Sequence, residues 1–357
     1  MSEQEILPGD GNSDGSLNDL VARRFTPLGP GPVGFGLVGC GVIADVYAQA
    51  FAAVEDARLV VAHDVEGERA QAYAERNGAE VAASLEDLLG RDDVRAVIVC
   101  VPSGLHADVA VAAARAGKHL VVEKPIDIHL DAARRLMDEA ARAGVSLNIV
   151  SQQRYNPGVQ AARRLLEEDR LGDVLFVQAR VPWYRSPEYY ASGEWRGTWA
   201  LDGGGAFMNQ GVHYADLVCW LFGQPDVISA HCANLDHQIE VEDLALATFR
   251  LPGETLGTLM TSTLSYPGFS TVLSVNGTQG SLELTDGALS GLELRGGTDG
   301  LDLGDTGSLG MPGGHIAQLA DMVRALQEGA PPPVNGEDGY RALRFVLDVY
   351  RQAGWRY

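Results

Sequence analysis

The sequence is short of basic residues and has no long apolar run. Its 357 residues include 27 Lys and Arg against 48 Asp and Glu, which gives a formal net charge of −21. A surface with this charge repels nucleic-acid phosphates and anionic lipids, and so argues against nucleic-acid or membrane partners. No segment approaches the roughly 18 consecutive apolar residues of a membrane-spanning helix. We therefore expect a small-molecule ligand, and an anionic ligand would need a local basic pocket.

Cysteine is also scarce, because the chain has only Cys40, Cys100, Cys219 and Cys232, and none forms a CxxC pair. We expect reduced thiols and a cytoplasmic location. The eight histidines include no HxxxH or HExxH pattern, so the sequence shows no metal site. No GxSxG elbow appears between a predicted strand and a predicted helix, which argues against a serine hydrolase. The N-terminus lacks the basic and then apolar pattern of a secretory signal.

The first part of the chain contains an N-terminal segment and a predicted nucleotide-binding domain. Residues 1–32 are polar, acidic and rich in Gly, Ser, Asn and Pro, which predicts either a disordered tail or an arm that lies on a partner subunit. From Val33, apolar runs of strand length alternate with helical patterns. This alternation is typical of right-handed βαβ units on a buried parallel sheet, so we predict a Rossmann domain over residues 33–151.

Residues 152–357 follow a different pattern. Longer runs with partial alternation, such as 243–251 and 271–285, indicate a largely antiparallel sheet with one open face, accompanied by helices. We expect this α/β domain to bind the substrate. Because these runs place Leu and Val on the open face, we also expect a homodimer or homotetramer built on it. The predicted fold class is α/β, with a Rossmann domain followed by an α/β domain that carries an open sheet.

A GxGxxA motif at Gly39–Ala44 lies between an apolar strand and a helix. Gly39 allows the tight turn, and Gly41 lets the backbone approach a pyrophosphate at the helix N-terminus, together with Val42 and Ile43. Asp64 ends the next strand about 20 residues later, the spacing of a carboxylate that accepts from ribose hydroxyls. Because residues 65–67 include no Arg or Lys for a 2′-phosphate, we predict NAD rather than NADP. The alternative is a turn followed by a helix-capping aspartate.

Lys124 is predicted to lie at the C-terminal end of a parallel strand, the edge where open α/β sheets bind ligands. Strand alternation directs Glu123 to the opposite side. Burial and a nearby oxidised nicotinamide would lower the pKa of Lys124, so that its amine could exchange a hydroxyl proton. The alternative is an ordinary surface lysine at a strand end.

The segments GxGxxA, VPSGLH, AGKHLVVEKP, QQRYNP and GGGAFMNQGVHYADLVCWLFG together resemble the glucose–fructose oxidoreductase / inositol dehydrogenase / MocA (Gfo/Idh/MocA) family from about Val33 to the C-terminus. The resemblance implies NAD- or NADP-dependent oxidation or reduction of sugars, cyclitols or sugar nucleotides, and an open sheet that often mediates oligomerisation. It also implies that Lys124 and His213 are catalytic and that the Lys124–Pro125 bond is cis. The implied cofactor contacts are Pro102, Ser103, His106, Glu123, Lys124 and Arg154.

The stretch LDGGGAFMNQGVHYADL combines three glycines with a helical pattern. We expect Gly203–Gly205 to form a bend that brings a helix, beginning near Ala206, against the nicotinamide. Asn209 and His213 are four residues apart and share a face toward the substrate. Many family dehydrogenases have Asp where this chain has Asn209. Since an amide orients a hydroxyl but cannot accept its proton, acid–base chemistry falls to Lys124 and His213, in an order that the sequence leaves open.

Aromatic and basic residues gather in VPWYRSPEYYASGEWRGTW, which includes Tyr184, Arg185, Trp195 and Arg196. Aromatic rings stack on sugar or base faces, and arginines bind carboxylate or phosphate groups. We therefore expect an anionic group on the substrate. The alternative is a folded loop whose aromatic rings pack on the domain.

The predicted function is an NAD-dependent oxidoreductase that transfers a hydride between a secondary alcohol of a sugar, sugar nucleotide or cyclitol and nicotinamide. One alternative is a glycoside-cleaving enzyme that uses tightly held NAD through a transient keto-sugar. Another is a non-catalytic NAD-binding regulator, although such a protein would need neither Lys124 nor His213.

Overall fold

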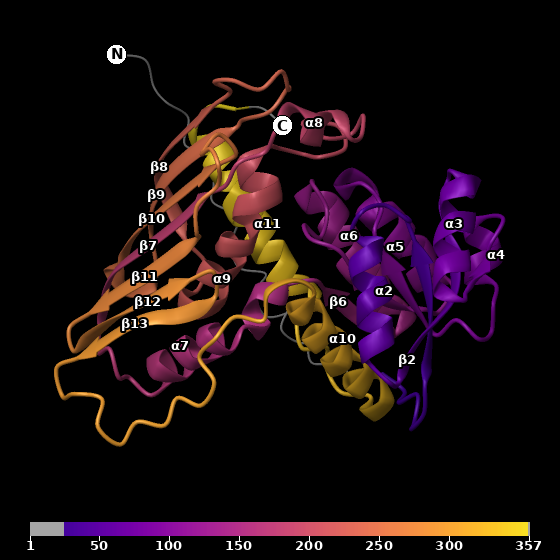
Figure 1. Ribbon diagram of the computed structural model, residues 1–357, viewed down its shortest axis with the longest axis horizontal. Helices are drawn as coiled ribbons and strands as arrows, with labels where there is room; N and C mark the ends of the chain where they lie inside the picture. Colours follow the sequence, from indigo (N-terminus) through magenta and orange to yellow (C-terminus); the bar gives the residue numbers. More distant parts are fainter. Residues whose placement is uncertain (1–24, 356–357) are drawn as a thin grey trace, which may run out of the picture.

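The computed structural model describes residues 25–355. Figure 1 shows two β-sheets in separate halves of the molecule, with helix α11 (Gly336–Gln352) running between them. This helix contacts α9 (Val212–Phe222) and β8 (Asp226–Ala233) of the second half and α6 (Leu130–Ala143) and β6 (Leu147–Ile149) of the first. Helix α11 therefore packs against both halves and joins them.

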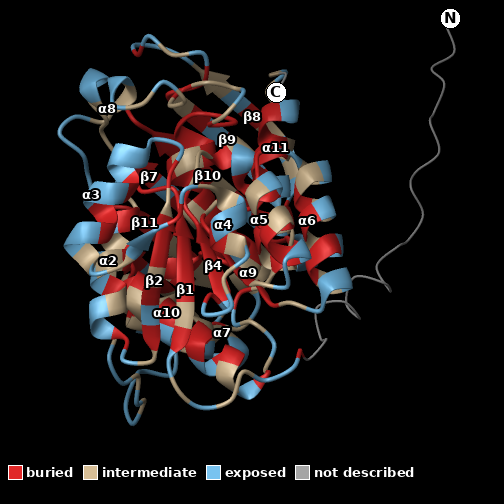
Figure 2. Cartoon of the chain, turned by 90° about the vertical axis from the view of Figure 1, so that its right-hand side faces the viewer, coloured by how far each residue is buried: buried red, intermediate tan, exposed pale blue. Residues whose placement is uncertain are grey.

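The first sheet has six parallel strands in the order β3-β2-β1-β4-β5-β6, the doubly wound order of a Rossmann fold. Its central strands are continuous apolar runs and are buried. Figure 2 shows them between helices whose outer surfaces are exposed. The strands are β1 (Val33–Val38), β2 (Ala57–His63), β3 (Glu80–Val81), β4 (Ala96–Val99), β5 (His119–Val122) and β6 (Leu147–Ile149). The Rossmann prediction is confirmed.

The helices of this half connect successive strands. They are α2 (Ala44–Ala53), α3 (Gly67–Asn77), α4 (Leu85–Leu89), α5 (His106–Arg115) and α6 (Leu130–Ala143). A further helix, α10 (Gly310–Glu328), comes from the region that we assigned to the second domain but packs on α2. Its buried residues Leu319, Met322 and Leu326 belong to the same apolar cluster as Phe35 and Tyr47. Helix α10 therefore completes the Rossmann half.

The second sheet has seven strands in the order β13-β12-β11-β7-β10-β9-β8. Only β7 and β10 pair in parallel, and all other neighbours are antiparallel, which confirms the predicted fold class. The strands are β7 (Val174–Pro182), β8 (Asp226–Ala233), β9 (Leu244–Arg250), β10 (Leu256–Ser262), β11 (Val272–Gly277), β12 (Gly280–Thr285) and β13 (Ala288–Leu294). Helices α7 (Pro157–Glu167), α9 (Val212–Phe222) and α11 cover one face, and the other face is open (Figure 1).

The open face of this sheet is apolar in its middle only. The register pairs Phe176 with Leu256, which are 37% and 48% exposed, and Leu246 on β9 is 43% exposed. The expectation for 271–285 was wrong in part, because Leu273 and Val275 are buried. Strand alternation turns these two side chains toward the helices and leaves Ser274 and Asn276 on the open side.

The predicted tail is partly folded. Residues 1–24 lie outside the described residues, so the tail expectation can be compared only over 25–32. Phe25 is buried, and its ring lies 4.8 Å from that of His119. The Leu28 N–H donates to the Leu326 carbonyl of α10 at 3.0 Å. Phe25 and Leu28 therefore attach this segment to the Rossmann half, although its polar composition alone predicts no ordered structure.

Two further observations concern the expected location. All four cysteines are free thiols. Within residues 25–355, no helix combines the length and apolar character needed to cross a membrane.

Candidate active site

The GxGxxA motif forms the turn between β1 and α2. Gly39 has φ +94°, and a Cβ there would lie 2.6 Å from the Cys100 carbonyl oxygen, so only glycine fits. Gly41 faces open space, since a Cβ would meet nothing within 4 Å. The N–H groups of Gly41, Val42 and Ile43 donate to no other group of the described chain, and α2 has no side-chain cap. This exposed helix N-terminus fits the pyrophosphate of a dinucleotide.

Asp64 follows directly after β2 and is buried. Its Oδ2 accepts from the Cys40 N–H at 2.8 Å and its Oδ1 from the Glu66 N–H at 2.9 Å. Arg69 on α3 lies 3.4 Å from the Asp64 carboxylate and also pairs with Glu66 at 2.6 Å. Arg69 lies beyond residues 65–67, on which the cofactor prediction depends, and the first turn of α3 brings its side chain back to the carboxylate. Because two carboxylates share Arg69, the site keeps a net negative charge.

We expect wild-type protein to bind NAD at least about 10-fold more tightly than NADP, or about 1.4 kcal/mol. The reason is that Asp64 repels a 2′-phosphate while Arg69 is already paired. Calorimetric titration of both cofactors measures the ratio, and equal dissociation constants would contradict this prediction. Asp64→Ser with Val65→Arg should narrow the gap by removing the anion and freeing Arg69, whereas Val65→Arg alone is the control that keeps the anion.

Glu123 and Lys124 follow β5 and point to different partners, as strand alternation predicted. Glu123 is buried, and its Oε1 accepts from the Tyr47 hydroxyl at 2.9 Å and lies 3.5 Å from Nε2 of His315 on α10. Burial would raise the pKa of Glu123, but His315, Lys124 and Tyr47 outweigh it and lower that pKa to about 2. Glu123 is therefore an ionised support beneath the site. The Lys124–Pro125 bond is cis, as the resemblance implied.

The Lys124 amine lies against Asn209. Its Nζ donates to the Asn209 main-chain oxygen at 3.0 Å and to Oδ1 at 3.3 Å. Burial lowers the pKa of Lys124; Glu123 and Asp202 oppose this shift, while Arg196 and Arg185 reinforce it. The lowered pKa makes the neutral amine, which can accept a proton, more accessible.

The glycine run before Asn209 makes close contacts within the protein. A Cβ on Gly205 would lie 1.7 Å from the Glu242 carbonyl oxygen, and one on Gly203, where φ is +74°, would lie 2.3 Å from Ile128. The expected reason for the glycines was an approach to the nicotinamide, but the described contacts are with Glu242 and Ile128. These contacts bring the start of the following helix close to Glu242 and Ile128.

That helix begins at Ala206, as expected, but its first turn is π-helical. This turn, η3 (Phe207–Gly211), leads into α9. The buried Glu242 carboxylate accepts from the Gly205 N–H at 2.9 Å, the Phe207 N–H at 2.8 Å and the Tyr350 hydroxyl at 2.8 Å. Burial raises the pKa of Glu242 to about 7. Glu242 anchors the start of the helix that carries Asn209, and no local sequence signal identifies it.

His213 lies on the first turn of α9 and lines the same small cavity as Lys124. Its ring is 6.4 Å from that of Trp183, and burial together with Lys124 lowers its pKa well below the usual range. A neutral imidazole at this position can donate or accept a hydrogen bond. The structure thus brings together the three predicted catalytic side chains. On the side of this helix that faces the core, Met208, Val212, Ala215 and Cys219 are buried.

The predicted substrate residues fall into two groups. The Arg185 guanidinium lies over the rings of Trp183 and Tyr189, at 5.2 and 5.0 Å, and the Arg196 guanidinium lies 4.4 Å from Tyr189 and 4.6 Å from Trp195. Within the described chain, neither arginine forms an ion pair with a carboxylate. Tyr184 instead packs on Tyr266, with ring centroids 5.1 Å apart. The structure therefore groups the side chains of Arg185, Trp195 and Arg196, whereas the Tyr184 ring packs on Tyr266 and only its main-chain oxygen accepts from Arg185, at 3.2 Å.

The predicted cofactor loop is tied to the Lys124–Pro125 segment by His106. Pro102 and Ser103 begin the turn η1 (Ser103–Leu105), and His106 follows as the first residue of α5. The buried His106 ring places Nδ1 2.7 Å from the Pro125 carbonyl oxygen and Nε2 2.9 Å from that of Val101. The His106 side chain does not cap α5. His106 holds the loop in place through these carbonyls.

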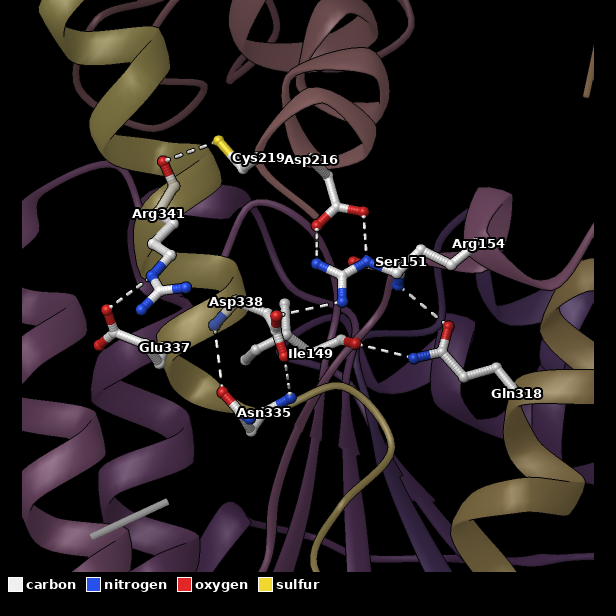
Figure 3. Close-up of polar contacts among 10 residues, drawn as sticks. All are labelled: Ile149, Ser151, Arg154, Asp216, Cys219, Gln318, Asn335, Glu337, Asp338 and Arg341. Atoms are coloured by element: carbon white, nitrogen blue, oxygen red, sulfur yellow. Dashed lines mark hydrogen bonds and ion pairs between the residues drawn. The ribbon is translucent and has the colours of Figure 1, made fainter. Parts of the chain in front are cut away.

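Arg154, on the turn η2 (Gln152–Tyr155), is engaged in a buried network that Figure 3 shows. Its Nε and Nη2 donate to the two oxygens of Asp216 at 2.8 and 2.6 Å, and Nη1 donates to Asp338 at 3.1 Å. The side chain is 3% exposed. These contacts occupy the guanidinium and hold Arg154 against α9 at Asp216, one turn beyond His213. Its place around the cofactor stays a prediction.

Two protein-family models match the chain, one in each of its two halves. An oxidoreductase family with an NAD-binding Rossmann fold matches residues 33–150, and the GFO/IDH/MocA C-terminal domain matches residues 159–283. The myo-inositol 2-dehydrogenase of Thermotoga maritima is 25% identical over 86% of this chain and 92% of its own length. The 1,5-anhydro-D-fructose reductase of Ensifer adhaerens is 29% identical over 89% of this chain and 96% of its own.

Among solved structures, the WlbA dehydrogenase of Bordetella pertussis, in complex with NADH and UDP-GlcNAcA, matches with a TM-score of 0.84. It is 30% identical, and the match covers 92% of this chain and 97% of that one. The fold, the dinucleotide turn and these matches define an NAD-binding oxidoreductase. The chain belongs to the Gfo/Idh/MocA family. No group of three or more His, Cys, Asp or Glu within residues 25–355 is arranged to hold a metal ion.

Proposed function

We propose that the chain oxidises a secondary alcohol of a sugar, sugar nucleotide or cyclitol, with Lys124 as the base. The observation that carries this proposal is the buried Lys124 amine, which lies against Asn209 and shares a cavity with His213 at the ligand-binding edge of the Rossmann sheet. NAD, held at the Gly39–Ala44 turn and Asp64, supplies the hydride acceptor. The remaining chemistry is proton transfer, which the protein's own side chains perform.

Each of the three polar side chains has a distinct part in this proposal. The Lys124 amine accepts the hydroxyl proton, since burial makes its neutral form accessible. His213 is neutral and hydrogen-bonds the same hydroxyl, which orients it toward the amine. Asn209 has no proton to exchange, and its oxygens hold the amine in place.

The substrate is proposed to be anionic and of the sugar-nucleotide type. Arg185 and Arg196 flank the Tyr189 ring without a carboxylate partner, in a chain whose net charge is −21. Two cations left unpaired in such a chain favour an anionic ligand. The relative crystallised with UDP-GlcNAcA supports the same class. Trp195 and Tyr189 would then pack on the sugar.

The proposal is tested by screening neutral sugars, cyclitols, sugar acids and nucleotide sugars for NADH absorbance, with the Lys124→Ala variant as the blank. We expect NADH to form with at least one anionic sugar derivative and not with the variant. Failure of every compound to yield NADH, with NAD bound, would contradict an oxidoreductase. Cleavage of a glycoside without net NADH would instead support the glycoside-cleaving alternative.

We also propose a homo-oligomer built on the open sheet face around Phe176, Leu246 and Leu256. Apolar area left in water there costs about 25 cal/mol per Å². We expect light scattering at micromolar concentration to show a dimer or tetramer, and Leu246→Glu to shift it toward monomer. Leu235→Glu, at an exposed leucine outside the strands, is the matched control. A monomeric wild-type protein would contradict the proposal.

The free cysteines support a reducing compartment such as the cytoplasm.

A further inference from the structure

A buried carboxylate lies directly behind the Lys124–Asn209 contact. Asp202 is 3% exposed and immediately precedes the glycine run. Its Oδ2 accepts from the Gly197 N–H at 2.8 Å, and its Oδ1 accepts from Nδ2 of Asn209 at 2.7 Å. No Lys, Arg or His of the described chain forms an ion pair with it. The sequence motifs predict no role for Asp202, and the proposed proton transfer does not use it.

The carboxylate determines which way the Asn209 amide points. An ionised carboxylate only accepts hydrogen bonds, so the NH₂ end of the amide must face Asp202. The amide oxygen is then directed away from Asp202, toward Nζ of Lys124 at 3.3 Å. The reverse amide orientation would bring two oxygens together at Asp202 and two sets of donors together at Lys124. Asp202 thus selects one of the two orientations.

The orientation of Asn209 in turn fixes the Lys124 amine. A neutral amine has two N–H donors and one lone pair, and Asn209 offers two acceptors on one side of Nζ, its main-chain oxygen at 3.0 Å and its Oδ1. When both donors are engaged there, the lone pair points away from Asn209. That free position is the one a substrate hydroxyl must reach.

We propose that Asp202 is a positioning residue that, acting through Asn209, aims the free position of the Lys124 amine at the substrate hydroxyl; this inference rests on the proposed function of Lys124. Its charge acts on the amine as well. The charged or titratable groups that act on Lys124 are Glu123, Asp202, Arg196 and Arg185, and His213 shares its cavity. Asp202 favours the ammonium form, whereas the two arginines and burial disfavour it. Burial raises the pKa of Asp202 itself to about 6.

The chain suits a direct test because its sequence contains only two lysines, Lys118 and Lys124. The pH dependence of acylation of each lysine, followed by mass spectrometry on the full-length protein, reports the neutral fraction of each amine without any substrate. In Asp202→Asn we expect half-maximal labelling of Lys124 to move to lower pH by about one unit, because an anion is lost. Lys118, whose Nζ donates to the carbonyls of Arg91 and Val94, is the internal reference and should not move.

The exchanged double variant distinguishes positioning from a merely structural role. Asn209→Asp alone should move Lys124 labelling to higher pH, since a carboxylate then contacts the ammonium. In the double variant Asp202→Asn with Asn209→Asp, residue 202 becomes the amide that donates and residue 209 becomes the carboxylate that accepts. Because one negative charge is again present near Lys124, half-maximal labelling of Lys124 should return to the wild-type pH or lie above it. With a turned-over substrate, Asp202→Asn should lower kcat at least about 10-fold with little change in KM, and the double variant should recover part of it.

Two controls keep the outcome clear. Asp236→Asn removes an exposed charge elsewhere in the second half and should leave both profiles unchanged. Should Asp202→Asn fail to fold, Asp202→Ser removes the same charge, and the same shift is expected. A folded variant whose labelling and kcat/KM pH profiles superpose on those of wild type overturns the inference. Failure of the proposed function, in which no sugar is oxidised, leaves the labelling result readable and is thereby distinguished.

Discussion

Replacing Lys124 with alanine is expected to lower kcat by about 10²-fold or more, because a positioned proton acceptor contributes roughly 10²–10⁴-fold to such reactions. The substitution removes the amine that lies against Asn209 and leaves no other lysine in the site. Steady-state NADH formation with a substrate from the screen measures the loss. Lys118→Ala, which removes the other lysine from a different part of the Rossmann half, is the matched control and should keep its kcat.

The same role of Lys124 predicts how the oxidation rate depends on pH. Burial lowers the pKa of Lys124, so the neutral amine is present above that lowered pKa and is lost as the pH falls through it. Oxidation rates should therefore fall on the acid side, and this limb should vanish in Lys124→Ala. His213→Ala should lower kcat to a similar extent but leave NAD affinity unchanged. An active Lys124→Ala variant with the wild-type pH profile would show that Lys124 is not the base.

The second large effect is on stability. Arg154→Met is expected to lower the free energy of unfolding by about 3–5 kcal/mol, because it leaves the buried Asp216 carboxylate without its partner. Urea titration with linear extrapolation measures this change. Arg76→Met breaks an exposed pair with Asp45 and should cost at most about 1 kcal/mol. A loss in Arg154→Met no larger than in this control would contradict the prediction.

The protonation of Asp216 determines how the stability loss in Arg154→Met depends on pH. Burial raises the pKa of Asp216, and Arg154 opposes that shift. Without Arg154 the folded-state pKa rises further above the unfolded value, so the destabilisation is full above that raised pKa and shrinks as the pH falls and Asp216 is protonated. Arg154→Met with Asp216→Leu removes both charges and should recover much of the lost stability, as replacement of buried ion pairs by apolar side chains often does.

The Rossmann half could be predicted well because its information is local. Apolar strands alternate with helices, and Gly39 and Asp64 stand at fixed spacings around them. The same holds for Lys124, since the end of a parallel strand can be read from the run that precedes it. Short or interrupted elements were missed for the opposite reason. Strand β13 contains Gly291 at a register shift, and β3 has two residues, so neither gives a periodic signal.

Residues that act at long range could not be predicted from local pattern. Glu242 reaches the Gly203–Gly205 bend from 37 positions away in sequence, and Arg154 reaches Asp216 over 62. Asp202 stood beside the motif, yet its role depends on the orientation of one amide. Arg69 was missed because a helix folds it back onto Asp64. In each case the partner is chosen by packing in three dimensions, which the sequence does not display.

The placement of α10 has a consequence for the order in which the protein can be made. During synthesis, strands β1 to β6 emerge first, but the helix that covers α2 ends only at Glu328. Until then, the apolar side of α2 and the partner that His315 provides for Glu123 are missing from the nascent chain. The packing of the Rossmann half can therefore be completed only after the whole second sheet has been translated.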